Sequence, residues 1–225
     1  KKEGFTISTR GNMTTVTGND GSGVIYGCRE LIDHVGQYKD LKFPAQLTDA
    51  PEMVLRGGCV GIQKMEYLPG RGVYEYPYTP ESFPWFYDKE QWIKYLDMLV
   101  ENRMNSLYLW NGHPFASLVK LEEYPFAVEV DEETFKKNEE MFSFLTAEAD
   151  KRGIFVIQMF YNILLSKPFA EHYGLKTQDR NRPITPLVSD YTRKSVAAFI
   201  EKYPNVGLLV CLGEAMDTYE DDVEW

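Results

Sequence analysis

The chain has 225 residues, of which 44% are hydrophobic and 14% are aromatic, and its formal net charge is −10. This length and apolar content suffice to bury a sizeable core in one large domain or two small ones. The acidic balance argues against a nucleic-acid partner, because binding a phosphate backbone needs a basic face. No apolar run approaches the ~20 residues of a membrane span, and no basic-then-apolar signal segment opens the chain. We therefore expect a soluble, already trimmed protein without a membrane partner.

The cysteine and histidine patterns give no sign of a metal site. Cys28, Cys59 and Cys211 lie far apart and form no CxxC pair, so neither a zinc site nor a disulfide framework is indicated. No two histidines have metal-ligand spacing. The acidic stretch at residues 214–224 does not follow the EF-hand pattern. We expect no metal and no cofactor.

The first 45 residues predict the carboxyl-terminal part of a small α/β accessory domain. Residues 5–9 and 13–17 alternate and are β-branched, which is typical of a hairpin. A helical pattern follows at residues 28–35. A hairpin with one helix is too small to be stable alone, so the rest of this domain is expected to precede it. Residues 46–52 then predict an extended linker.

From residue 53 onward, short apolar runs alternate with amphipathic helical patterns. The runs predict strands at residues 53–62, 106–110, 154–160 and 206–212, and the helical spacing predicts helices at residues 92–100, 131–152 and 191–203. Such alternation implies parallel strands with helical crossovers. We expect an α/β fold in which residues 53–225 supply strands 1–4, the first half of a (β/α)8 TIM-type barrel, after the end of a small α+β domain.

A doubly wound parallel sheet is the structural alternative. No Gly-rich phosphate loop follows any of the predicted strands, which argues against a nucleotide-binding sheet of that kind. Half of a barrel would leave two strand edges unpaired. An isolated segment would therefore need swapping, homo-oligomerisation or another closure of its sheet.

Residues that follow the strands of a parallel barrel share one face, where barrel enzymes keep their chemistry. Glu214 follows the fourth predicted strand. A glutamate shielded beside aromatic side chains has a raised pKa and can protonate a leaving oxygen. Its alternative role is an ion pair at the rim of the barrel, and spacing alone does not decide between the two. Glu214 is the candidate catalytic residue.

The candidate substrate-binding residues come from all four strand ends. Arg56 could donate paired hydrogen bonds to sugar hydroxyls or to a carboxylate, or it could form a structural ion pair. His113 could bind substrate or cap a loop carbonyl. The other candidates offer aromatic faces, amides and a second carboxyl group, and they are Trp110, Asn111, Tyr161, Asn162 and Asp217. Together these groups are what cleavage of a glycosidic bond needs.

A long connection at residues 64–88 is rich in tyrosine, proline and other aromatic residues. Connections of this length in a compact domain are commonly functional or mobile. The segment could cover a substrate cleft. Alternatively, its rings could pack under the other half of the barrel or onto the amino-terminal domain.

The order of four short motifs resembles glycoside hydrolases that place a small α/β domain ahead of a (β/α)8 barrel, as family 20 β-hexosaminidases and family 67 α-glucuronidases do. The motifs are the turn Gly18-Asn19-Asp20-Gly21-Ser22-Gly23-Val24-Ile25-Tyr26-Gly27, Asp49-Ala50-Pro51, Leu55-Arg56-Gly57-Gly58 and the glutamate after the fourth strand. The resemblance implies that Arg56 holds sugar hydroxyls and that Glu214 is the general acid.

One departure from family 20 narrows the expected substrate. Those hexosaminidases have an aspartate directly before the acid to orient the acetamido group, whereas this chain has Gly213. The resemblance therefore implies a poly- or oligosaccharide with a uronic acid or neutral sugar rather than an N-acetylhexosamine. The second catalytic group would come from later strands.

We thus expect a glycosidase segment of the kind used in bacterial polysaccharide degradation. A polymeric substrate implies a periplasmic or extracellular location. Two other functions remain open on the sequence: a non-catalytic carbohydrate-binding protein on the same barrel, and a barrel enzyme of unrelated chemistry such as a lyase or a deacetylase.

Overall fold

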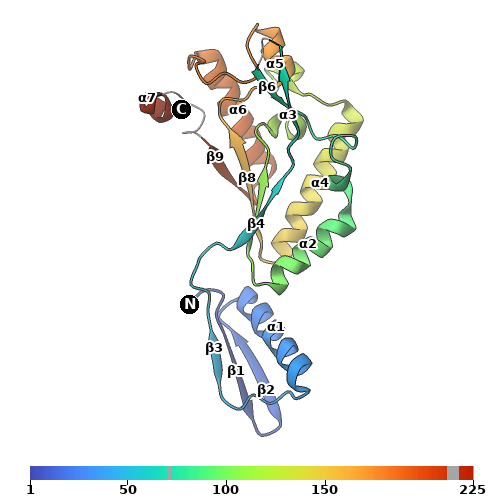
Figure 1. The fold of residues 1–225 in the computed structure, drawn as a ribbon, viewed down its shortest axis with the longest axis vertical. Coiled ribbons are helices and arrows are strands. Elements are labelled where there is room, and N and C mark those ends of the chain that lie inside the picture. Colours follow the sequence, from blue (N-terminus) through green and yellow to red (C-terminus); the bar gives the residue numbers. More distant parts are fainter. Residues whose placement is uncertain (70–71, 212–217, 225) are drawn as a thin grey trace.

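The computed structural model describes residues 1–69, 72–211 and 218–224. Figure 1 shows two units stacked along the long axis of the molecule, which we call the amino-terminal unit (residues 1–49) and the barrel unit (residues 57–224). No helix within the described residues is long and apolar enough to cross a membrane.

The amino-terminal unit is a three-stranded antiparallel sheet packed against one helix. Its elements are β1 (Phe5–Arg10), β2 (Met13–Gly18), α1 (Gly21–Tyr38) and β3 (Leu47–Asp49), and the strand order is β2-β1-β3. The predicted hairpin is confirmed, and its buried side chains Phe5 and Ile7 pack with Tyr26 of the helix. Three residues of the predicted linker instead form β3, which pairs with β1. A three-residue strand is too short to leave a periodic signal in the sequence.

The barrel unit is built on a four-stranded parallel sheet, as the alternating sequence pattern predicts. Its strands are β4 (Gly57–Gly61), β7 (Ser106–Trp110), β8 (Phe155–Tyr161) and β9 (Val206–Cys211). They lie in the order β4-β7-β8-β9, so each strand neighbours the one before it in the chain. A doubly wound sheet would reverse its strand order at a switch point. The observed order has no such reversal and fits the first half of a (β/α)8 barrel.

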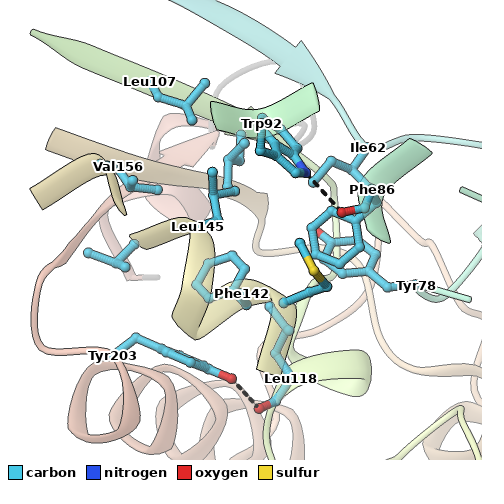
Figure 2. Packing of buried hydrophobic residues seen from close by; sticks show 14 of the residues in the cluster. Ile62, Tyr78, Phe86, Trp92, Leu107, Leu118, Phe142, Leu145, Val156 and Tyr203 are labelled. Atoms are coloured by element: carbon cyan, nitrogen blue, oxygen red, sulfur yellow. Dashed lines mark hydrogen bonds between the residues drawn. The ribbon is translucent and has the colours of Figure 1, made fainter. Parts of the chain in front are cut away.

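Helices cover one face of this sheet (Figure 1). The three long ones are α2 (Lys89–Glu101), α4 (Glu132–Lys151) and α6 (Pro186–Lys202). A side chain caps the amino end of each of these helices. In α4, for example, Asp131 accepts a hydrogen bond from Thr134 N at 2.7 Å. Leu107 and Val156 point from the strands into the helix layer and belong to the same buried cluster as Leu145 and Phe142, as Figure 2 shows. This packing forms the main hydrophobic core.

Shorter elements fill the connections after the strands. They are β5 (Met65–Leu68), β6 (Gly72–Glu75), α3 (Phe115–Leu118), α5 (Lys167–His172), α7 (Tyr219–Glu224) and the 3-10 turns η1 (Pro84–Tyr87) and η2 (Pro125–Ala127). The predicted aromatic connection at 64–88 thus contains an antiparallel hairpin, β5–β6. Its later rings, including Tyr78 and Phe86, are buried in the main core (Figure 2). They pack in the helix layer of their own unit, which neither sequence-based alternative anticipated.

Candidate functional site at the carboxyl ends of the strands

Side chains alternate across the parallel sheet, and one set points to the face that the helices leave uncovered, which we call the inner face. In β8 the burial alternates, so Val156 and Phe160 enter the core while Met159 and Tyr161 are only half-buried on the inner face. Trp110 of β7 lies opposite Met159 in the strand register. The rings of Trp110 and Tyr161 meet edge to face, with centroids 5.6 Å apart. The structure therefore brings two predicted site residues together at the carboxyl ends of β7 and β8.

Asn111 braces the ends of β4 and β7. Its Nδ2 donates to Ile62 O at 2.8 Å, and its Oδ1 accepts from His113 N at 2.9 Å. Its residue is 2% exposed, so both ends of this buried amide are satisfied. The side chain holds the turn after β7 against the end of the first barrel strand.

Asn162 is equally buried, and it follows β8. It borders a groove between β9 and α6 whose apolar lining includes Leu208 and Val210. Asn162 therefore lies at the correct end of the sheet, but beside the helix layer.

His113 lies in the turn after β7 and is held by an aromatic neighbour. Its Nε2 is 2.8 Å from the Tyr191 hydroxyl, and the two rings stack with centroids 5.8 Å apart. Burial, together with the nearby Arg182 guanidinium, lowers the pKa of His113 to about 3. The imidazole is therefore neutral at physiological pH. Its partner is a tyrosine hydroxyl and not the loop carbonyl considered from the sequence.

Glu75 is a buried carboxyl group at this end of the sheet and was not among the site residues predicted from the sequence. It ends β6, is 7% exposed and accepts hydrogen bonds from Gln63, Gly112 and His113. Burial raises its pKa, although those hydrogen bonds act in the opposite direction. The one available signal was an acidic residue alone in the aromatic stretch Tyr74-Glu75-Tyr76.

Glu129 is a second carboxyl group with a raised pKa, and it fastens the same hairpin. Its Oε2 accepts from the Tyr74 hydroxyl and its Oε1 from Lys167 N at the start of α5, both at 2.7 Å. Burial raises the pKa of Glu129 to about 7. Glu129 lies just before a run of helix-start acids, so its position in the sequence gave no signal for this role.

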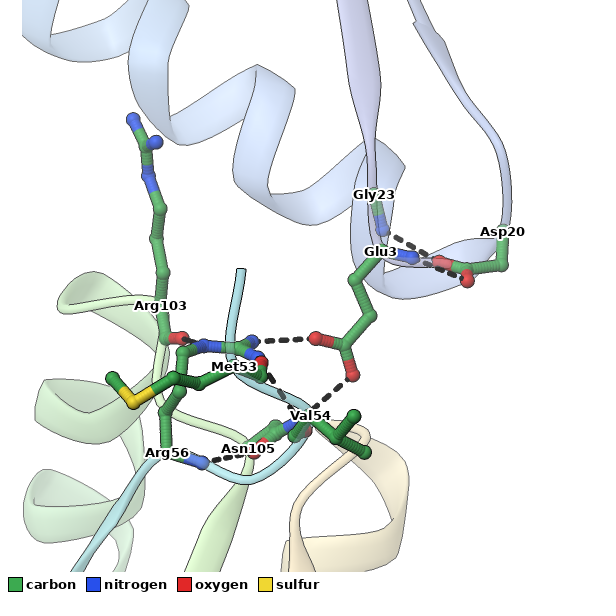
Figure 3. Close-up of polar contacts among 8 residues, drawn as sticks. All are labelled: Glu3, Asp20, Gly23, Met53, Val54, Arg56, Arg103 and Asn105. Carbon is green, nitrogen blue, oxygen red and sulfur yellow. Dashed lines mark hydrogen bonds and ion pairs between the residues drawn. The ribbon is translucent and has the colours of Figure 1, made fainter. Parts of the chain in front are cut away.

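Arg56 does not join the other candidates, which corrects the expectation that it would converge with them. It precedes β4 and lies at the amino end of the sheet, against the amino-terminal unit (Figure 3). Its guanidinium forms an ion pair with Glu3 at 2.5 Å and donates from Nε to Arg103 O at 2.9 Å and from an NH group to Met53 O at 2.7 Å. The residue thus has the structural role considered as its alternative, with Glu3 as partner.

Two candidates, Glu214 and Asp217, lie outside the described residues. The last described residue of β9, Cys211, pairs in register with Tyr161. Within residues 1–69, 72–211 and 218–224, no group of three or more His, Cys, Asp or Glu side chains could hold a metal ion.

Comparison with solved structures gives strong matches. The chain is 80% identical to a GH138 enzyme targeting pectin rhamnogalacturonan II, with a TM-score of 0.94, over 99% of this chain and 26% of that one. It also superposes on the Flavobacterium johnsoniae chitobiase of family 20, with 16% identity, a TM-score of 0.59 and coverage of 99% and 33%. A β-N-acetylhexosaminidase from Bacteroides fragilis gives 17% identity, a TM-score of 0.57 and coverage of 91% and 41%.

No protein-family model matches the chain, and no curated protein matches it. The chitobiase and the β-N-acetylhexosaminidase show the fold alone, because their identities to this chain are only 16% and 17%. They confirm the α/β architecture expected for part of a TIM-barrel glycoside hydrolase. The chain spans about a quarter of the GH138 enzyme that it matches. The predicted resemblance to two-domain glycoside hydrolases is confirmed.

Proposed function

We propose that this chain supplies the end of an accessory domain and the first half of the catalytic barrel of a glycoside hydrolase that cleaves a pectin-type, uronic-acid polysaccharide. The observation that carries the proposal is the 80% identity, across 99% of the chain, to an enzyme that targets pectin rhamnogalacturonan II. The half-barrel with an aromatic pair at its carboxyl edge is consistent with it. A polymeric substrate would place the protein in the periplasm or outside the cell.

In this proposal Glu214 is the proton donor. It follows the last residue of β9 by three positions in the sequence, and the carboxyl end of a barrel strand is where such enzymes hold catalytic groups. A carboxyl group shielded by nearby rings keeps its proton at neutral pH and can give it to the leaving oxygen. A second carboxyl group would come from a later strand, and its distance from Glu214 would determine retention or inversion.

Trp110 and Tyr161 would form the wall that a sugar ring contacts. Both are half-buried on the inner face, and flat amphipathic rings suit the apolar face of a pyranose. Asn111, His113, Asn162 and Asp217 remain proposed substrate-binding residues at the ends of the same strands. A neutral His113 can bind a sugar hydroxyl without carrying charge.

The test is hydrolysis by the full-length protein that carries this sequence, wild type against Glu214→Gln. Loss of a general acid should lower turnover at least ~100-fold on a substrate with a poor leaving group. The loss should be much smaller on an aryl glycoside whose leaving group needs no proton. A loss below about tenfold on the natural linkage would contradict the assignment of Glu214.

The same assay separates the other functions. An unsaturated uronate product would indicate β-elimination by a lyase. Retained binding of the oligosaccharide without any product would indicate a carbohydrate-binding protein.

A further inference from the structure

The carboxylate of Glu75 is enclosed by N–H groups from two different strand ends. Its Oε1 accepts from Gln63 Nε2 at 2.6 Å, just after β4, and its Oε2 accepts from His113 N at 3.1 Å and from Gly112 N, just after β7. None of the ion pairs among the described residues involves Glu75. The negative charge is therefore stabilised by hydrogen bonds alone.

The turn after β7 is shaped around this carboxylate. A Cβ added at Gly112 would lie 2.7 Å from the Glu75 Oε2 atom and 2.2 Å from the Leu164 Cδ1 atom. Real Cβ atoms do not approach other atoms so closely, so any residue other than glycine would displace the ends of these two side chains. Glu75 and Gly112 thus fit each other with no intervening space.

Gly112 also connects Glu75 to the aromatic pair. The Gly112 carbonyl accepts a hydrogen bond from Tyr161 N at 2.9 Å, at the end of β8. The Tyr161 ring in turn contacts Trp110. One residue therefore separates the Glu75 carboxylate from the backbone of Tyr161, and the same turn carries Asn111 and His113.

The carboxylate divides its two oxygens between the backbone and a side chain. Oε2 accepts from both backbone N–H groups, and Oε1 accepts from the Gln63 amide, which can turn over and present its oxygen instead. A glutamine in place of Glu75 could therefore keep these contacts, whereas a methionine would offer no acceptor. Because the site is buried, loss of the acceptor would leave the two backbone N–H groups unpaired.

We propose that Glu75 is a positioning residue for the glycosidase reaction: its carboxylate fixes the Asn111–His113 turn and, through Gly112, the sugar-facing pair Trp110 and Tyr161. This inference rests on the proposed function and deepens it, because it assigns the β5–β6 hairpin as the support of the substrate wall. Glu75 touches no reacting atom in this role. Its loss should weaken substrate binding more than chemistry.

The experiment compares Glu75→Met with Glu66→Met in the full-length protein. Glu66 lies on the same hairpin, is exposed and accepts only from the Tyr76 hydroxyl among the hydrogen bonds described, so its variant is the matched control. For Glu75→Met we expect KM for the oligosaccharide to rise about tenfold and kcat to stay within about threefold of wild type. Glu66→Met should change neither. Amide hydrogen exchange at residues 111–113 should accelerate in Glu75→Met alone.

A second variant covers the case in which Glu75→Met does not fold. Gln63→Met removes one donor from half-buried Gln63 and keeps its length, so we expect a folded protein with KM raised about threefold. An unchanged KM with a lower kcat would overturn the positioning role, because that result is expected when only a smaller fraction of the protein is folded and active. An inactive wild type would defeat the proposed function, whereas the exchange at residues 111–113 would still test the link between Glu75 and the turn.

Discussion

At the amino end of the parallel sheet the buried carboxylate of Glu3 is paired with a cation, Arg56, whereas at the carboxyl end the buried carboxylate of Glu75 has only N–H donors. Glu129, also at the carboxyl end, is bound by a hydroxyl and a backbone amide, and His113 there is neutral. The amino end therefore has a structural role, and we call the contacts of Glu3 and Arg56 between the two units the joint. The carboxyl end keeps ionisable groups with shifted pKa values, which cluster at functional sites in proteins.

A third residue of the joint hydrogen-bonds to both members of its ion pair. Asn105 donates to Glu3 Oε1 at 2.9 Å and accepts from Arg56 N at 2.9 Å, so it connects both members of the ion pair (Figure 3). Arg103 adds a more exposed pair with Asp49. These contacts fix the amino-terminal unit against the barrel unit at the end of the sheet that lies away from the proposed chemistry.

The largest effect on stability is expected when the joint loses its cation. In Arg56→Met the Glu3 carboxylate would stay buried without its partner, so the free energy of unfolding should fall by about 3 kcal/mol. Urea denaturation of the full-length protein measures this. Lys89→Met, which breaks an exposed pair with Glu140, is the control and should leave the midpoint nearly unchanged. Equal midpoints for Arg56→Met and wild type would show that the joint is not structural.

A smaller effect is expected at the turn of the carboxyl end. Gly112→Ala would force its new methyl group against Leu164 and Glu75, and such overpacking costs about 1–3 kcal/mol. Gly36→Ala in α1, where nothing lies within 4 Å of the added Cβ, should instead stabilise by up to about 1 kcal/mol. Thermal unfolding of both variants checks the contrast. Similar shifts in the two variants would argue against a closely fitted turn.

The pH dependence should also differ between the ends. Because the pKa of Glu129 is raised to about 7 in the folded state from a usual value of 4.5, the folded state binds the extra proton. Ionising Glu129 therefore lowers the free energy of unfolding. This loss is absent below about pH 4.5, grows as the pH rises towards 7 and is complete above pH 7. The Tm of Glu129→Gln, relative to that of the wild type, should therefore increase by a few degrees between pH 5 and pH 8. Parallel Tm curves would contradict the raised pKa.

Sequence patterns predicted the layout of the barrel unit well, since long periodic elements leave clear signals. The apolar run at 106–110 is β7, and the helix predicted at 131–152 is α4, which Asp131 caps. The Arg56 assignment failed because a sequence shows that a residue borders a strand, whereas the structure decides which partner it reaches. Here that partner, Glu3, is 53 positions away in the sequence.

The carboxyl groups of the site were harder to foresee. Glu75 belongs to a short hairpin inside a tyrosine-rich connection, and its donors come from two strand ends that are distant in the sequence. No local period marks such a contact. The aromatic pair was predictable because Trp110 ends one apolar run and Tyr161 directly follows another.

The most direct test of the catalytic role proposed for the carboxyl end is the initial rate of sugar release from rhamnogalacturonan II by the full-length protein, wild type beside Glu214→Gln, with hexosaminide and neutral glycosides in parallel. We predict release from the uronic-acid polysaccharide and at least a ~100-fold lower rate in the variant, with binding retained. Equal rates in the two proteins, or release from the hexosaminide alone, would contradict it.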